Sequence, residues 1–366
     1  MDSLQKIGKI EAIALIVTIT INQIILNFPL TIISDTGSSA WITTFIISII
    51  AIIFCLVICK LFNKFPSQDI IDISTYLGGT FLKIVISILY ILFFILISGL
   101  FLRYLSNSVK QIYFEKSPLA FILLFFLIPV AFSCKLGLKS ISSLNLIVTP
   151  IVLISMLIIL FSTIKDFIPQ NIFPILGFGV SKTFFIGLNN IFSFSAFAYL
   201  YFLMPLLKNP EEFKKIAITS IILSAIHLFL AIICLLMMFP FIPFSDEMLS
   251  IYLLARLIEF GKFFQRVDAI FILIWILSLF CFLSINVLFI NKILKKIALL
   301  KNHKQLTYSI CSIIFSIALL FPNISNIKYI QNTILKYIVI LLVFVISLLI
   351  LILANLKFKR RNYNEN

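Results

Sequence analysis

Long apolar runs constrain this chain more than any other feature of its sequence. A helix that crosses a bilayer needs roughly 20 predominantly apolar residues, and about ten such runs follow one another along the chain. Their approximate limits are Glu11–Ile33, Trp41–Phe62, Phe81–Leu105, Leu119–Cys134, Ser142–Ile164, Thr183–Leu206, Ala217–Met238, Val267–Ile290, Leu306–Phe321 and Ile334–Ala354. The pattern predicts an all-α polytopic membrane protein with about ten transmembrane helices.

Composition supports the bilayer as the solvent of this chain. Apolar residues make up 62% of its 366 residues and charged residues 12%, whereas a soluble domain is about 45–50% apolar and about 25% charged. A water-soluble fold could not keep so many apolar side chains out of water, which excludes an ordinary globular enzyme. The longest stretch outside the runs, Phe239–Arg266, is too short for a nucleotide-binding domain. Because Met1–Ile10 is polar and leads directly into a full-length run, no cleavable signal peptide is expected.

Lys and Arg residues orient the predicted spans. If the N-terminus is cytoplasmic, 19 of the 29 basic residues face the cytoplasm, which favours cytoplasmic N- and C-termini and an even number of spans. The net charge of +15 is then mainly a topology signal. We expect residues 1–355 to form a single transmembrane domain and residues 356–366 a basic cytoplasmic tail that anchors to lipid headgroups. No basic domain is present to dock nucleic acid.

Catalytic and metal-binding constellations are not apparent. The six cysteines lie in or at the edges of apolar runs, without the three or four neighbouring ligands that a metal site requires. His227 lies inside the seventh run without an acidic partner at similar depth, so we expect a packed, hydrogen-bonded histidine. The acids avoid the runs apart from Asp268 at the start of the eighth, which disfavours a pump with a chain of buried carboxylates. We therefore expect no enzyme activity, no cofactor and no metal.

Two runs carry residues that favour a break in a helix. The first contains Asn22, Gln23, Asn27 and Pro29, and the sixth contains GLNNIFSFSAF from Gly187. These are corresponding positions if the ten runs divide into two repeats of five, about 11–164 and 183–355. Transporters built from inverted repeats bind their ligands where helices unwind near the midplane. Simple interhelical hydrogen bonding by the Asn and Ser side chains is the competing interpretation.

A cavity between the first, third, sixth and eighth runs is the predicted ligand site. Its predicted residues are Asn27, Phe28, Pro29, Ser98, Gly99, Ser193, Phe194, Ser195, Trp275 and Ser284. An amphipathic segment, Ser245–Phe264, is too short and polar to span, and we expect an interfacial or lid helix there.

The sequence resembles the B-subunit permease family of bacterial spore germinant receptors (the GerAB type), within the amino acid–polyamine–organocation transporter superfamily. The most specific stretches are NIFPILGFG at Asn171–Gly179 and QRVDAIFILIW at Gln265–Trp275; NFPL at Asn27–Leu30, AWI at Ala40–Ile42, the Pro66–Gly78 spacing and Pro205 support them. The sequence departs from the family at Ser39, where an acid is common, and around Ala196–Tyr199, where many members carry an acid.

The resemblance implies a LeuT-like five-plus-five inverted-repeat fold and a function in spore germination. It implies a subunit that senses a nutrient, often an amino acid, in the inner spore membrane, together with an A subunit and a C-subunit lipoprotein. An active secondary amino acid transporter is the alternative, with Ser278 or Ser284 as candidates for an ion site. A third possibility is an ion-conducting or structural subunit that binds no nutrient. The scarcity of charged residues in the runs favours the sensor.

Overall fold

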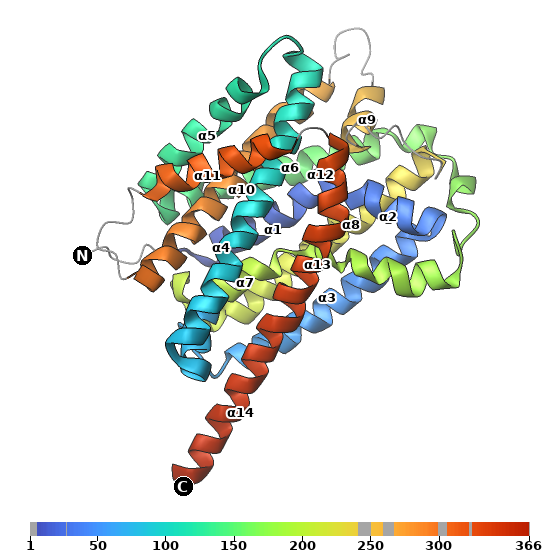
Figure 1. The fold of residues 1–366 in the computed structure, drawn as a ribbon. Helices are drawn as coiled ribbons and strands as arrows, with labels where there is room; N and C mark the ends of the chain where they lie inside the picture. Colours follow the sequence, from blue (N-terminus) through green and yellow to red (C-terminus); the bar gives the residue numbers. More distant parts are fainter. Residues whose placement is uncertain are drawn as a thin grey trace.

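The computed structural model describes residues 6–26, 28–240, 250–258, 267–298, 306–321 and 324–365. Within these ranges the chain is helical almost throughout, and the only strand-like pairing is an isolated bridge between Ile7 and Leu207. Figure 1 shows the helices gathered into one bundle, with the end of α14 extending beyond it.

The α-helices follow the apolar runs of the sequence. In the first half they are α1 (Lys9–Leu26), α2 (Phe28–Thr36), α3 (Ala40–Phe62), α4 (Ile70–Tyr113), α5 (Leu119–Leu136) and α6 (Leu138–Ser162). In the second half they are α7 (Phe197–Leu203), α8 (Phe213–Met238), α9 (Ser250–Leu257), α10 (Val267–Ala298), α11 (Leu306–Leu320), α12 (Ile324–Ile330), α13 (Lys336–Val339) and α14 (Ser347–Glu365). Non-α helical segments include the 3₁₀ helices η1 (Gly37–Ser39) and η5 (Gly187–Phe194) and the π-helices η4 (Lys182–Ile186), η8 (Gln331–Leu335) and η9 (Ile340–Ile346).

Seven helical stretches of the described residues are long and apolar enough to cross a membrane, and a bent pair brings the number to eight. The two remaining predicted spans correspond to α1, with 18 residues, and α11, with 15 residues. A bilayer core offers no partners for backbone N–H and C=O groups, so apolar runs of this length must bond internally as helices. The prediction of an all-α polytopic membrane protein is confirmed.

Local sequence signals set where the helices begin and turn. Asp69 caps the start of α4, where its carboxylate accepts hydrogen bonds from the backbone N–H groups of Ile71 and Asp72. Gly79 has a φ of +67°, a conformation that glycine adopts at little cost, and it separates the first turns of α4 from its long membrane-spanning part. Gly137, with a φ of 95°, similarly separates α5 from α6.

Helix α1 lies at the centre of the bundle (Figure 1) and packs against α6, α8 and α10. Its apolar side chains from Leu15 to Ile25 are buried on all sides, which explains why this helix shows little amphipathic character. The terminal end of the bundle is defined here as the end where Ile7 pairs with Leu207 and Asn355 bonds to the carbonyl of Leu61. The opposite end, reached by Thr36 and the 171–179 loop, is called the distal end.

At the distal end, the 171–179 loop packs on the turn between α2 and α3. The backbone N–H of Phe178 donates to the carbonyl of Thr36 at 3.2 Å, and the Ser38 hydroxyl donates to the carbonyl of Pro174 at 2.5 Å. Thr183 joins the same assembly through the Ser39 hydroxyl at 2.8 Å. The NIFPILGFG stretch, which carried much of the family resemblance, therefore packs on the distal end of the first span and stabilises its position.

Part of the segment expected to form an interfacial or lid helix is helical in the structure. Helix α9 buries Ile251 and Leu254 and packs against α1, α6, α8 and α10. Its Tyr252 hydroxyl donates to the carboxylate of Asp268 at 3.2 Å. The rest of the predicted segment, 245–249 and 259–264, lies outside the described residues.

Candidate functional site

The sixth apolar run does not form one straight helix. It passes from the π-helix η4 through the 3₁₀ helix η5 to α7, and Lys182–Phe194 and Phe197–Leu206 are bent by 41° to one another. Gly187 permits the close approach of this segment to its neighbours, because a Cβ there would lie 2.6 Å from Thr43 Cγ2 and 2.8 Å from Thr36 Cγ2. The change of helix type interrupts the α-helical bonding pattern just before Ser195, so the polar groups at the bend are available to other partners.

Two amides of α1 lie against this bend and against α10. Gln23 Nε2 donates to Ser195 Oγ at 3.0 Å, and Asn22 Nδ2 donates to Ser278 Oγ at 3.0 Å. Asn22 Nδ2 also bonds to the carbonyl of Thr18 at 2.9 Å, which holds its side chain along α1. These contacts join the first, sixth and eighth spans at one depth of the bundle.

Several buried polar atoms around this junction have no hydrogen-bond partner among the described residues. They are Asn22 Oδ1, Gln23 Oε1, Ser193 Oγ and Trp275 Nε1. Along the chain, Trp275 is one helical turn before Ser278, and Ser193 is two residues before Ser195. A buried polar atom without a partner costs about 1–3 kcal/mol, and such atoms in a native fold call for a ligand, water or function. The set offers two amide acceptors, an indole donor and a hydroxyl.

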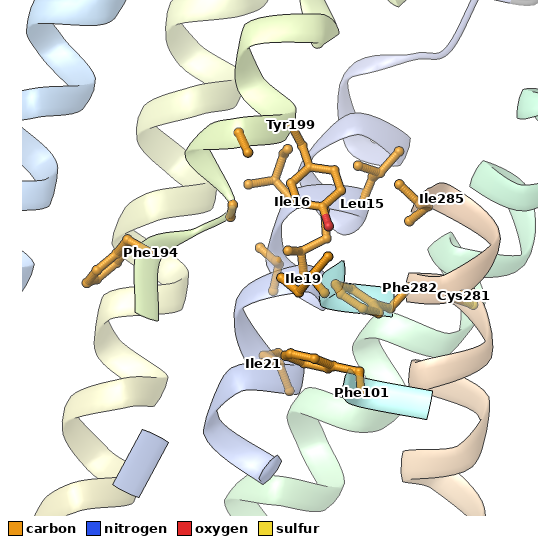
Figure 2. Packing of buried hydrophobic residues seen from close by; sticks show 14 of the residues in the cluster. Leu15, Ile16, Ile19, Ile21, Phe101, Phe194, Tyr199, Cys281, Phe282 and Ile285 are labelled. Atoms are coloured by element: carbon orange, nitrogen blue, oxygen red, sulfur yellow. The ribbon is translucent and has the colours of Figure 1, made fainter. Parts of the chain in front are cut away.

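A second polar chain connects the sixth, eighth and third spans nearer the terminal end. The Tyr199 hydroxyl donates to Asn286 Oδ1 at 2.5 Å, and Asn286 Nδ2 donates to Ser98 Oγ at 2.9 Å. The Tyr199 ring also packs in a T-shaped arrangement on Phe289, with ring centroids 5.7 Å apart. Figure 2 shows Tyr199 directed toward the labelled residues of α1 and α10.

The structure brings together some of the predicted site residues. Ser195 bonds to Gln23, and Ser98 bonds to Asn286 in the second polar chain. Ser193 and Trp275 are buried and lie within three residues of Ser195 and Ser278 along their own helices. Phe28, at the start of α2, packs edge-on against Phe192 with ring centroids 6.5 Å apart. Pro29 follows in the first turn of α2 and is buried.

The other predicted residues lie elsewhere. Phe194 points away from the labelled side chains of α1 and α10 in Figure 2. Ser284 bonds to Ser133 of α5 at 2.7 Å. Gly99 lies against α11, because a Cβ there would be 2.6 Å from Ile317 Cγ2. Asn27 lies outside the described residues, so the predicted break at that position is not described.

Tyr199 and Asn286 are functional candidates that sequence reasoning missed. An Asn inside the eighth apolar run, four residues before its end, was a signal that could have identified one of them. Asn22 and Gln23 were recognised as polar residues of the first run, but not as the groups that contact the eighth and the sixth spans, respectively.

Ion pairs hold both ends of the bundle. At the terminal end, Glu11 of α1 pairs with Lys139 of α6, and Lys296 of α10 lies 2.5 Å from Asp69. Burial raises the pKa of the Asp69 carboxyl to about 6, although the Lys296 ammonium opposes that shift. At the distal end, Lys336 of α13 lies 3.0 Å from Asp35 of α2. The junction, with its buried polar atoms that lack hydrogen-bond partners, lies between these two ends of the bundle.

The His, Cys, Asp and Glu side chains of the described residues do not gather into a metal-ligand cluster. No group of three or more His, Cys, Asp or Glu side chains there could hold a metal ion. The six cysteines are free and buried. His227 Nδ1 bonds to the carbonyl of Leu223 at 2.9 Å, as in a packed histidine, while its Nε2 is buried without a partner.

Comparison with solved structures identifies the fold. The structure of Mhp1, a nucleobase-cation-symport-1 family transporter in a closed conformation with bromovinylhydantoin bound, matches with a TM-score of 0.59 and 11% identity. The match covers 90% of this chain and 75% of that one. The protein thus has the LeuT-like transporter fold expected from the family resemblance.

Sequence comparisons point to one family. Spore germination protein YndE of Bacillus subtilis (strain 168) is 23% identical over 281 residues, which is 75% of this chain and 76% of that protein. Spore germination protein B2 of the same organism is 23% identical over 207 residues, covering 55% and 56%. The family model described as spore germination protein, of the spore permease type, matches residues 6–327. This chain belongs to the spore germination permease family.

Proposed function

We propose that this protein is the nutrient-sensing membrane subunit of a spore germination receptor. The nutrient would bind between the first, third, sixth and eighth spans, at the junction of Asn22, Gln23, Ser193 and Trp275. The single observation that carries this proposal is the group of buried, unpaired polar atoms at the bend of the sixth span.

The chemistry of the junction suits a free amino acid. The Asn22 and Gln23 oxygens are acceptors for an ammonium group, whereas the Trp275 indole N–H and the Ser193 hydroxyl are donors for a carboxylate. Phe28 and Phe192 offer an apolar surface nearby for a side chain. Such a ligand would satisfy atoms that are otherwise buried without partners, and that gain is a source of binding free energy.

A sensor must bind its nutrient more tightly in one conformation than in another. The bent segment from η5 to α7 and the lid helix α9 are the proposed moving parts, since both contact α1. We further propose that the terminal end faces the cytoplasm, that the membrane is the inner spore membrane, and that A and C subunits of the receptor read the change. The excess of Lys and Arg at the terminal end supports this orientation.

Active secondary transport of an amino acid is the second candidate function. The likeness of the fold to a transporter of the nucleobase-cation-symport-1 family favours it. Coupling would need an ion site, for which the Ser278 hydroxyl beside α1 is a candidate. An ion-conducting or structural subunit without a nutrient is the remaining alternative.

Bulky substitutions at the bend test the proposed site. Ser193→Leu and Ser195→Leu should each abolish or strongly shift the germination response of spores to a panel of single amino acids. The matched control is Ser316→Leu, because Ser316 is an exposed residue of α11 that bonds only within its own helix. If both junction variants respond like the control to every effective nutrient, the proposed site is wrong.

Uptake distinguishes the sensor from the transporter. Labelled amino acids are offered to proteoliposomes that contain the protein, with and without a proton or sodium gradient. We expect binding without gradient-driven accumulation. Accumulation that follows the gradient would favour the transporter instead.

A further inference from the structure

The ion pair at the distal end belongs to a larger polar cluster. Asp35 Oδ2 accepts hydrogen bonds from Lys336 Nζ at 3.0 Å and from Asn190 Nδ2 at 2.9 Å. The Lys336 side chain is only 8% exposed, while that of Asp35 is 27% exposed and so reaches the surface. Three spans, the first, the sixth and the tenth, therefore meet at one acidic and one basic group.

The π-helix η8 adds a fourth side chain to this cluster. The backbone N–H of Lys336 bonds to the carbonyl of Gln331, five residues earlier, so the two side chains stand on the same face of the helix. An α-helix would place residues three and four apart on that face instead. The π-helical turn thus presents a carboxamide and an ammonium on one helix face, and the ammonium contacts Asp35 of the first span and the Phe192 ring of the sixth.

Two atoms of this cluster are buried without a hydrogen-bond partner, and their polarities are complementary. Asn190 Oδ1, an acceptor, belongs to the side chain that contacts Asp35. Gln331 Nε2, a donor, belongs to the side chain that shares a face with Lys336. The cluster therefore has a carboxylate with a spare acceptor on one side and an ammonium with a spare donor on the other.

We propose that Asp35, Asn190, Gln331 and Lys336 form a second ligand site, the distal subsite, that selects free α-amino acids by both charged groups. The ammonium of the ligand would pair with Asp35 and Asn190 Oδ1, and its carboxylate with Lys336 and Gln331 Nε2. This proposal rests on the proposed function and names the ligand class that first enters the protein.

The energetics of the ion pair give the distal subsite its selectivity. A ligand that inserts between Asp35 and Lys336 must replace the partner of each, because a buried charge without a counter-charge is costly. A zwitterion replaces both partners at once. An amine leaves Lys336 without a counter-charge, and an N-acetylated amino acid does the same to Asp35.

The distal subsite lies on the way to the junction along two segments of the chain. In the first span, Phe28 lies between Asp35 and the junction residue Gln23. In η5, Phe192 lies between Asn190 and the junction residue Ser193. Phe28 and Phe192 pack on one another, and Lys336 Nζ lies 5.8 Å from the centroid of the Phe192 ring. Occupation of the distal subsite by a zwitterion would therefore separate Lys336 from Asp35 next to the aromatic pair that precedes the junction.

Binding measurements on the full chain in lipid nanodiscs test the proposal. The probes are L-alanine, L-leucine and L-phenylalanine, each compared with its N-acetyl derivative and its decarboxylated amine by calorimetry. We expect Asp35→Asn to weaken binding of the amino acids by about tenfold or more, and binding of the N-acetyl derivatives far less.

Substitutions of Lys336 and Gln331, which would bind the carboxylate of the ligand, should affect the N-acetyl derivatives and spare the amines. Lys336→Gln should weaken binding of the amino acids and their N-acetyl derivatives but not of the amines, and Gln331→Leu should do so to a smaller degree. Asp166→Asn and Lys182→Gln are the matched controls, since both remove an exposed charge elsewhere at the distal end. They should leave all three affinities unchanged.

The outcomes separate this proposal from the proposed function. If Asp35→Asn and Lys336→Gln change the affinities of all three classes of probe equally, the ion pair is only a structural latch and the distal subsite is overturned. Failure of the unsubstituted protein to prefer any amino acid over its derivatives overturns it as well. If selectivity depends on Asp35 and Lys336 while Ser193→Leu and Ser195→Leu spores germinate normally, the junction fails and the distal subsite stands.

Discussion

A Cβ atom added to Gly177 would lie 2.0 Å from the carbonyl oxygen of Thr36. The same atom would lie 2.8 Å from the backbone nitrogen of Ser39, so the clash is with the backbone of the turn and not with a movable side chain. The 171–179 loop can therefore brace the first span only with glycine at this position. The relationship explains physically why a glycine occupies this place in the NIFPILGFG stretch.

Gly177→Ala should prevent the loop from packing on the turn and should sharply lower the yield and melting temperature of the purified protein. Gly179→Ala is the matched control, because Gly179 also has a positive φ, of +111°, but nothing lies within 4 Å of an added Cβ. Backbone strain alone costs on the order of 1–3 kcal/mol. Equal melting temperatures of the two variants would contradict the proposed steric contact.

The position of Gly99 leads to a second prediction. An added Cβ would lie 2.6 Å from Ile317 Cγ2, so Gly99→Ala should separate α4 from α11 and lower the melting temperature, at a typical overpacking cost of about 1–3 kcal/mol. The double variant with Ile317→Ala should recover most of the loss, since it removes the clashing methyl group. If Gly99→Ala instead leaves the melting temperature unchanged and alters the nutrient response, Gly99 is a ligand-site residue as the sequence analysis expected.

The difference between Gly99 and Ser195 shows what sequence patterns can and cannot predict here. Helix existence follows from apolar runs, because a bilayer leaves the backbone no other way to pair its polar groups. The bend near Ser195 was predictable as well, since Gly, Asn and Ser residues weaken a helix locally. Which side of a span faces the centre depends on the packing of its neighbours, and a run that is apolar on all sides carries no such signal.

Lys336 illustrates a second limit. From the sequence it is one of the basic residues assigned to the outside, at the start of the last apolar run. In the structure it is buried and paired with Asp35, 301 residues away. Such a pair is set by the approach of the first and tenth spans, and the π-helical turn that presents Lys336 has no recognisable sequence signature.

The Tyr199–Asn286–Ser98 chain leads to a third prediction. Tyr199→Phe removes the donor to Asn286 Oδ1 and leaves that oxygen buried without its partner, which should cost about 1–3 kcal/mol. Ser98→Ala removes the acceptor of Asn286 Nδ2 and should have a smaller or similar effect. In a double-mutant cycle of melting temperatures, the two losses should not add, because both act through the Asn286 amide. Additive losses would show that Tyr199 and Ser98 are not coupled through Asn286.

The raised pKa of Asp69 leads to a prediction about pH. Its value of about 6 lies above the ordinary value of 3.8, so between these limits the folded protein holds a proton that the unfolded chain has lost. The contribution of Asp69 to stability is therefore complete below about pH 4 and is lost as the pH rises through about 6. The melting temperature of the unsubstituted protein, relative to that of Asp69→Asn, should fall across this window. Asp72→Asn is the control, because Asp72 also contacts Lys296, at 2.6 Å, but is 40% exposed, and it should retain the fall. If the melting temperature of Asp69→Asn itself falls across this window as much as that of the unsubstituted protein, another group is responsible for the titration.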